Sequence, residues 1–219
     1  MNTLTKMALG LMGQLKARPA RGDSAPTLAL PAARTSGGMP LMQALQQRQS
    51  QREFATTALP EQLLADLLWA AAGINRPALG GRTAPSAMNS QEVDVYVALP
   101  AGLYLYEPAS HRLRLDVASD VRRVTGYQDF TDEAALDLVF VADHSRMKLV
   151  PAAQREAYAH TAVGAMAQNV YLFCAAQGLA TVIRAWIDRD ALFKAMALAA
   201  DQQVLLAQTV GYPAARSAS

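Results

Sequence analysis

Apolar residues recur every three or four positions in three stretches of the chain, a spacing that is typical of amphipathic helices. The first two stretches follow prolines, which suit the first turn of a helix, and the third ends at a glycine. Helices are therefore predicted over residues 41–48, 61–72 and 155–177. The last one has apolar residues on most sides, which is typical of a helix buried at the centre of a domain.

Other stretches alternate between apolar and polar residues or form short apolar runs, which indicates β-strands. Residues 92–99 alternate, so one face of this strand is predicted to be buried. Residues 137–143 are almost continuously apolar, as in a central strand that is covered on both faces. Further strands are predicted over residues 102–108, 111–117, 180–187 and 204–212, and a short helix over 190–198. These elements predict one α+β domain with a mostly antiparallel sheet around buried helices.

The first 38 residues differ in pattern from the rest. Residues 1–17 have apolar positions at helical spacing, which predicts an amphipathic docking helix, although Lys6 and the apolar run after it also fit the early part of a signal peptide. Residues 18–38 are rich in Pro, Gly, Ala and Ser, as in an extended arm. We therefore divide the chain into a helix and arm, residues 1–38, and a single domain, residues 39–219. Without a clear export signal, a cytoplasmic location is favoured.

The composition excludes several classes of function. The chain has 219 residues and 52% hydrophobic content, enough for a large core, and its net charge of +2 does not favour contact with nucleic acid. One cysteine, Cys174, cannot form an intramolecular disulfide. The three histidines lack the spacing of metal ligands, so no metal site is predicted. No apolar stretch is long enough to span a membrane.

The stretch RQSQREF, residues 48–54, places two arginines on either side of a serine hydroxyl, just beyond a predicted helix. Guanidinium groups and a hydroxyl together suit a tetrahedral anion, so phosphate is the predicted ligand of Arg48, Ser50 and Arg52. The glycine-rich fingerprints of Rossmann and P-loop nucleotide sites are missing from the sequence. The alternative is that both arginines cap helix carbonyls and face solvent.

This stretch has four companions further along the chain: LLWAAAGIN, RTAPSAMNSQ, AQNVYLFCAAQGLATVIRAW and TVGYPAAR. Together and in this order they resemble the nitroreductase family of FMN flavoproteins. The first two companions look most like its SagB-type dehydrogenase branch. The similarity extends over residues 39–216, and it implies a nitroreductase-like fold with FMN bound at the interface of a homodimer and NAD(P)H as the electron donor.

The resemblance assigns roles to residues around the predicted phosphate. It implies that Arg48 and Ser50 hold the phosphate and ribityl chain of FMN. Arg52 would lie at the pyrimidine edge of the flavin ring, where a cation stabilises the negative charge of the reduced cofactor. Arg216 matches a late basic residue of the family at the phosphate, and Gln49 stands where many relatives carry a second basic residue.

Two further segments are implied to contact the flavin. The first matches a loop that the family contributes to the site of the neighbouring subunit, and its residues are Pro85, Ser86, Ala87, Asn89 and Gln91. The second lies along the flavin with a backbone N–H toward N5, and its residues are Ile183, Arg184 and Ala185. Many relatives have Glu or Gly in place of Arg184. Ser86 and Asn89 also fit a purely turn-forming role.

The implied chemistry is ping-pong transfer of hydride from NAD(P)H through FMN to a small acceptor, such as a nitroaromatic or a quinone. It requires no catalytic side chain beyond the electrostatic support of Arg52. Tyr127 and Phe130 are predicted to roof the acceptor pocket; alternatively, both anchor a surface helix on the sheet. Two other functions stay open: a SagB-type dehydrogenase that oxidises a substrate such as a peptide azoline with oxygen as acceptor, and a non-catalytic flavin-binding dimeric module.

Overall fold

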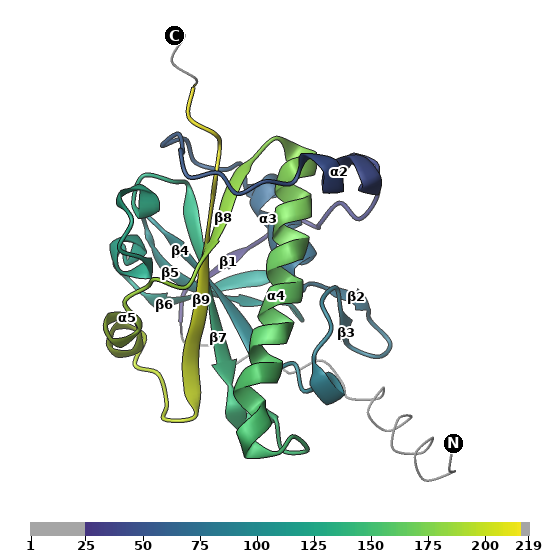
Figure 1. Cartoon of the computed structure of the whole chain (residues 1–219), viewed down its shortest axis with the longest axis vertical. Coiled ribbons are helices and arrows are strands. Elements are labelled where there is room, and N and C mark those ends of the chain that lie inside the picture. The colour runs from purple at the N-terminus through teal and green to yellow at the C-terminus, as the bar shows by residue number, and fades with distance from the viewer. Residues whose placement is uncertain (1–24, 216–219) are drawn as a thin grey trace.

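A computed structural model describes residues 25–215 of the chain (Figure 1). Within this part, seven strands form one sheet in the order β1-β6-β5-β4-β7-β9-β8, and every pair of neighbours is antiparallel. The strands are β1 (Thr27–Ala29), β4 (Val93–Leu99), β5 (Gly102–Glu107), β6 (Arg112–Val117), β7 (Leu136–Asp143), β8 (Ala180–Arg184) and β9 (Gln202–Gly211). The predicted antiparallel sheet is confirmed.

Four α-helices flank this sheet in the described residues: α2 (Leu41–Gln47), α3 (Glu61–Ala72), α4 (Ala152–Gln177) and α5 (Arg189–Ala195). All four were predicted, so the α+β class is confirmed. The longest, α4, begins directly after Pro151, a residue that suits a helix start. It ends at Gly178, whose φ of 68° lies in the left-handed region that glycine adopts at low cost.

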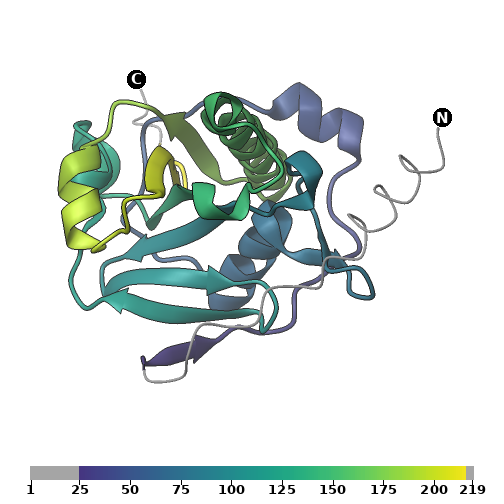
Figure 2. The same cartoon turned by 90° about the horizontal axis from the view of Figure 1, so that it is seen from below.

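The sheet is covered on both faces, which explains the burial of its central strands (Figure 2). All eight residues of β7 are buried, as predicted for a central strand. In β4 only one face was predicted to be buried, but both are. Val95 and Val97 pack into a core cluster with α3 and α4. Tyr96 and Ala98 point to the opposite face, as the two-residue period of a strand requires, and pack into a second cluster with α5.

The central helix α4 is buried along one side only. Ala159, Val163 and Met166 belong to the core cluster that covers the sheet. The other side is exposed, although the apolar sequence predicted burial on most sides, and its exposed residues include Ala157, Thr161, Gly164 and Gln168. No other element in residues 25–215 covers this side of the helix.

Two predicted irregular segments contain regular structure. The long loop of residues 74–91 includes a short hairpin of β2 (Ile74–Arg76) and β3 (Gly81–Arg82), and then a 3-10 turn, η1 (Ala87–Asn89). The predicted arm contributes β1, which pairs with β6 at the sheet edge. The predicted N-terminal helix lies outside the described residues, and the division of the chain at residue 39 stays a prediction. None of the described helices is long and apolar enough to span a membrane.

Candidate functional site

The stretch of residues 48–54 leaves α2 and runs between two other segments of the chain. The backbone N–H of Gln51 donates to the carbonyl oxygen of Thr181 in β8 at 3.0 Å. Further on, the N–H of Ala55 donates to Tyr212, and the N–H of Ala214 donates to Glu53, at 2.9 and 3.1 Å. These bonds hold the predicted phosphate-binding stretch beside β8 and the end of β9, two segments that the sequence also assigned to the site.

A tyrosine that the sequence analysis missed connects two of the predicted segments. The hydroxyl of Tyr171, on the buried side of α4, accepts a hydrogen bond from the backbone N–H of Ile183 at 3.0 Å. The same hydroxyl lies 2.8 Å from Oγ of Ser50. Either of these two hydroxyls can donate the proton of this second bond. The only sequence signal for this role is a hydroxyl in the middle of an otherwise apolar helix face.

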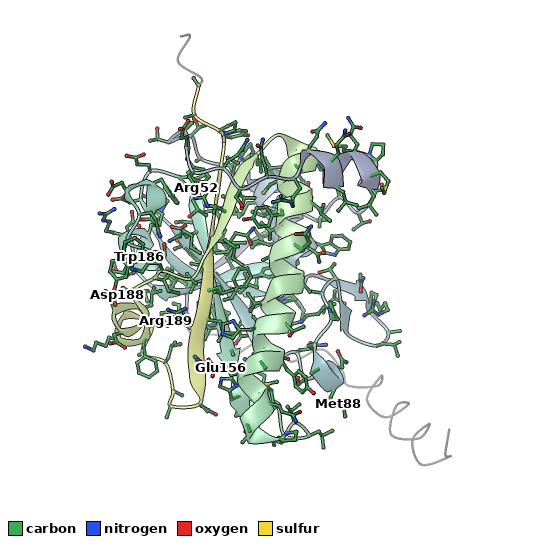
Figure 3. All side chains as sticks on the ribbon, in the orientation of Figure 1. Arg52, Met88, Glu156, Trp186, Asp188 and Arg189 are labelled. Carbon is green, nitrogen blue, oxygen red and sulfur yellow. The ribbon has the colours of Figure 1, made fainter. Side chains whose placement is uncertain are left out.

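Arg48 also packs on this tyrosine. Its guanidinium carbon lies 5.3 Å from the centre of the Tyr171 ring, within the range of a cation–π contact. It pairs with no carboxylate among residues 25–215, so its charge is not neutralised by this part of the chain. Arg52 is exposed on the same stretch (Figure 3). Arg216 lies outside the described residues.

A cavity of about 490 Å³ opens beside this stretch. Its walls come from the end of α2, the C-terminal third of α4 and the start of β8, and they include Arg48, Gln49, Gln51, Tyr171 and Thr181. None of the described lining residues is acidic. A guanidinium, amides and hydroxyls around a space of this size fit a phosphate-bearing ligand such as FMN. Cys174 also lines the cavity, but burial raises the pKa of its thiol, which makes it a poor nucleophile.

The loop of residues 85–91 has a strained backbone. Met88, Asn89 and Gln91 have φ angles of 54°, 51° and 47°, which L-residues rarely adopt. Ser86 acts as a turn former here, because its Oγ accepts from the backbone N–H of Gln91 at 3.0 Å. Outside the loop, the guanidinium of Arg146 donates to the carbonyl oxygen of Gln91 at 3.0 Å. Strain that the surrounding structure maintains in this way is often found at ligand sites.

This loop and the cavity lie far apart in one chain. Figure 3 shows Arg52 near one end of the molecule and Met88 near the other, and in Figure 1 the long helix α4 extends between these two regions. Pro85 is exposed and Ala87 is half-buried. The structure thus brings Arg48, Gln49, Ser50 and Ile183 together, but not the residues of the 85–91 loop.

The side chain of Arg184 points into the protein interior. It is 6% exposed, and Nη2 donates to Oδ1 of Asp137 at 2.7 Å, while Nε donates to Oγ1 of Thr209 at 3.0 Å. Burial raises the pKa of Asp137 and lowers the pKa of Arg184, and the attraction between the two charges opposes both changes. Any contact of residue 184 with a ligand in the cavity would therefore come from its backbone. Ala185, the next residue, is exposed.

The two predicted roof residues lie on one segment but differ in their surroundings. Phe130 is half-buried, and its ring centre lies 5.4 Å from that of Phe54. Tyr127 is 51% exposed and contacts the still more exposed Trp186, with 5.4 Å between ring centres. Among the described residues no cluster of His, Cys, Asp and Glu could hold a metal ion.

Comparisons with known proteins identify similar sequences and similar structures. Residues 45–212 match the model of the nitroreductase family. A candidate nitroreductase of Methanocaldococcus jannaschii is 30% identical over 154 residues, which cover 65% of this chain and 77% of that protein. A crystal structure of a candidate nitroreductase from Ralstonia eutropha has 50% identity and a TM-score of 0.84, and the match covers 92% of this chain and 96% of that one.

A third relative was solved with a cofactor. This candidate nitroreductase from Desulfovibrio desulfuricans, in complex with FMN, is 25% identical with a TM-score of 0.59, and the match covers 84% of this chain and 91% of that one. The family match covers most of the chain and includes both the 48–54 stretch and β8. The chain therefore belongs to the nitroreductase family.

Proposed function

We propose that the protein is an FMN-dependent oxidoreductase that passes hydride from NAD(P)H to a small acceptor, such as a nitroaromatic or a quinone, by a ping-pong mechanism. One observation carries the proposal: Tyr171 joins Ser50 to the backbone of Ile183 beside a cavity lined by Arg48. The FMN complex of the Desulfovibrio relative supports the choice of cofactor. When bound, FMN supplies the hydride-transfer chemistry, so the protein has to bind and orient it.

Residues of the cavity and of the neighbouring segments would share this task. Arg48 and Ser50 would hold the phosphate, with the Arg48 guanidinium, which has no carboxylate partner in residues 25–215, as the main source of charge. Gln49 would add a neutral donor at the same end, and Arg216 a second cation. The backbone of residues 183–185 would line the ring system, held in place because Tyr171 accepts from Ile183. Tyr127 and Phe130 would form one wall of the acceptor site.

A homodimer is part of this proposal. None of residues 85–91 lines the cavity of its own chain, and Figure 3 shows Met88 of this loop at the opposite end of the molecule from Arg52. A second copy with two-fold symmetry could place its Pro85, Ser86, Ala87, Asn89 and Gln91 over the flavin. The uncovered side of α4 and the exposed apolar residues Leu41 and Met42 of α2 offer the contact surface. A single-chain mass in light scattering at micromolar concentration would contradict the dimer.

The absorption spectrum and steady-state kinetics of the purified protein test the function. We expect flavin absorption that stays with the protein on gel filtration, and oxidation of NADH or NADPH that depends on menadione or a nitrofuran. Bound flavin with substrate-dependent oxygen consumption but no NAD(P)H oxidation would favour the SagB-type dehydrogenase. Bound flavin with no turnover would favour the non-catalytic module. Protein that binds no added FMN would refute all three.

Replacing Arg52 with alanine should lower the reduction potential of the bound flavin. A cation at the pyrimidine edge stabilises the reduced cofactor more than the oxidised one, so its removal favours the oxidised form. A loss of about 1.4 kcal/mol for a two-electron couple corresponds to about 30 mV. The midpoint potential is measured by reductive titration against a reference dye. Arg123→Ala, which removes a surface arginine paired with Asp129 and Asp132, serves as the control; equal potentials in both variants would refute the placement of Arg52.

A further inference from the structure

The buried arginine at the end of β8 also holds the segment that contains the predicted roof. Besides its partner Asp137, the guanidinium of Arg184 donates through Nη1 to the carbonyl oxygen of Thr125 at 2.6 Å and to Oε1 of Gln128 at 3.2 Å. Nη2 also donates to Oγ1 of Thr125 at 3.1 Å. These bonds join β8 to η2 (Arg122–Thr125) and to the turn that follows it. One side chain thus connects two segments nearly sixty residues apart in the sequence.

The space for this guanidinium depends on Gly126, which belongs to the segment that Arg184 holds, residues 125–130 (the held segment). A Cβ atom at Gly126 would overlap Nη1 of Arg184 and approach Oε1 of Gln128 to 2.5 Å. The φ angle of Gly126 is 177°, an extended conformation that any residue adopts. Glycine is therefore needed here for space and not for backbone conformation. Arg184 and Gly126 fit together as a pair.

The held segment contacts residues in or just after two predicted flavin-binding segments, the 48–54 stretch and β8. Its Phe130 contacts Phe54, two residues beyond Arg52, and the guanidinium of Arg184 lies 5.8 Å from the centre of the Phe130 ring. Its Tyr127 contacts Trp186, which follows β8 directly after Ala185. Trp186 is labelled in Figure 3. A shift of residues 125–130 relative to β8 would therefore move two aromatic rings beside the proposed flavin position.

We propose that Arg184 is a positioning residue for the acceptor site, an inference that rests on the proposed function. Its buried side chain does not touch the cofactor. It fixes residues 125–130 against β8 and thereby determines where Tyr127 and Phe130 lie, and so which acceptors fit. The Asp137 carboxylate accepts from Nη2 and helps to orient the guanidinium.

Gly126→Ala tests this proposal without removing any charged group. The new methyl group displaces the guanidinium, so we expect amide hydrogen exchange in residues 122–131 to become about tenfold faster, while exchange in residues 159–170 of α4 stays unchanged. We also expect the ratio of kcat/KM for menadione to that for a nitrofuran to change by about threefold or more. FMN affinity and reduction potential should stay within about twofold and about 10 mV of wild type, because the side chain does not reach the cofactor.

A double variant used as a second background distinguishes loss of the Arg184 contact from loss of folding. Arg184→Met with Asp137→Leu replaces the ion pair by apolar side chains of similar size, a change that buried pairs often tolerate. In this background the added Gly126→Ala should have little further effect on exchange or acceptor preference, because Nη1 is no longer present. The single replacement Arg184→Lys, with Gly126 and Asp137 unchanged, should keep part of the wild-type acceptor preference. Lysine keeps the charge of arginine but not its forked donors.

Three results would overturn the proposal: Gly126→Ala with wild-type exchange and acceptor ratio, equal effects of Gly126→Ala in both backgrounds, or a tenfold loss of FMN affinity in Arg184→Lys with an unchanged acceptor ratio. The last result would mean that Arg184 acts on the cofactor directly. Failure of the proposed function is recognised separately, because the wild-type protein would then bind no FMN or show no turnover. In that case the exchange measurement still reports whether Arg184 holds the segment.

Discussion

Arg48→Ala is expected to weaken FMN binding by about 10- to 100-fold, because a hydrogen bond from a guanidinium to a phosphate contributes about 1.5–3 kcal/mol. In the structure this guanidinium lines the cavity and has no carboxylate partner among the described residues, so its charge is available to a ligand. The measurement is a titration of the apoprotein with FMN, followed by the quenching of flavin fluorescence.

Comparison with riboflavin makes this test specific for the phosphate. Wild-type protein should prefer FMN over riboflavin, and Arg48→Ala should lose most of that preference while its affinity for riboflavin changes little. Arg123→Ala is the matched control, since it removes an exposed arginine that pairs with Asp129 and Asp132 instead. An unchanged preference in Arg48→Ala would show that Arg48 does not bind the phosphate.

Asp137→Ala is expected to destabilise the protein by about 3–5 kcal/mol, the usual cost of leaving one charge of a buried pair without its partner. Asp137 is fully buried and accepts from Arg184, Thr125 and Thr209. Removing the carboxylate leaves the guanidinium and both hydroxyls without this acceptor. The measurement is urea unfolding followed by tryptophan fluorescence, at one fixed concentration of FMN, because ligand binding itself adds to stability.

The double replacement Arg184→Met and Asp137→Leu is the control for this effect. It removes both charges together, so the free energy of unfolding should fall by clearly less than in Asp137→Ala. Asp129→Ala provides a second control, because this exposed carboxylate pairs with the exposed Arg123 at the surface, where an ion pair contributes only about 0–1 kcal/mol. Equal losses in Asp137→Ala and Asp129→Ala would contradict the importance assigned to the buried pair.

Local patterns in the sequence predicted most elements of the fold. The continuous apolar run of β7 predicted a central strand. Pro40 and Pro60 predicted where α2 and α3 begin, and Gly178 predicted where α4 ends, because these residues act on their own few neighbours. The start of α4 lies three residues before the predicted one. The burial of both faces of β4 could not be read in this way. It depends on α5, which follows β4 by about ninety residues and supplies the second core cluster.

The candidate site shows the same difference between what local sequence predicts and what long-range contacts decide. The sequence by itself indicated Arg48, Ser50 and Arg52 as anion ligands, because their chemistry and their spacing are local properties. Only the tertiary structure revealed that Tyr171 joins Ser50 to Ile183, since this contact links residues 121 positions apart. It also revealed that Arg184 faces the interior, where Asp137 meets it across the sheet. Pattern determines what a segment can become, whereas long-range packing decides which side chains meet and which way each one points.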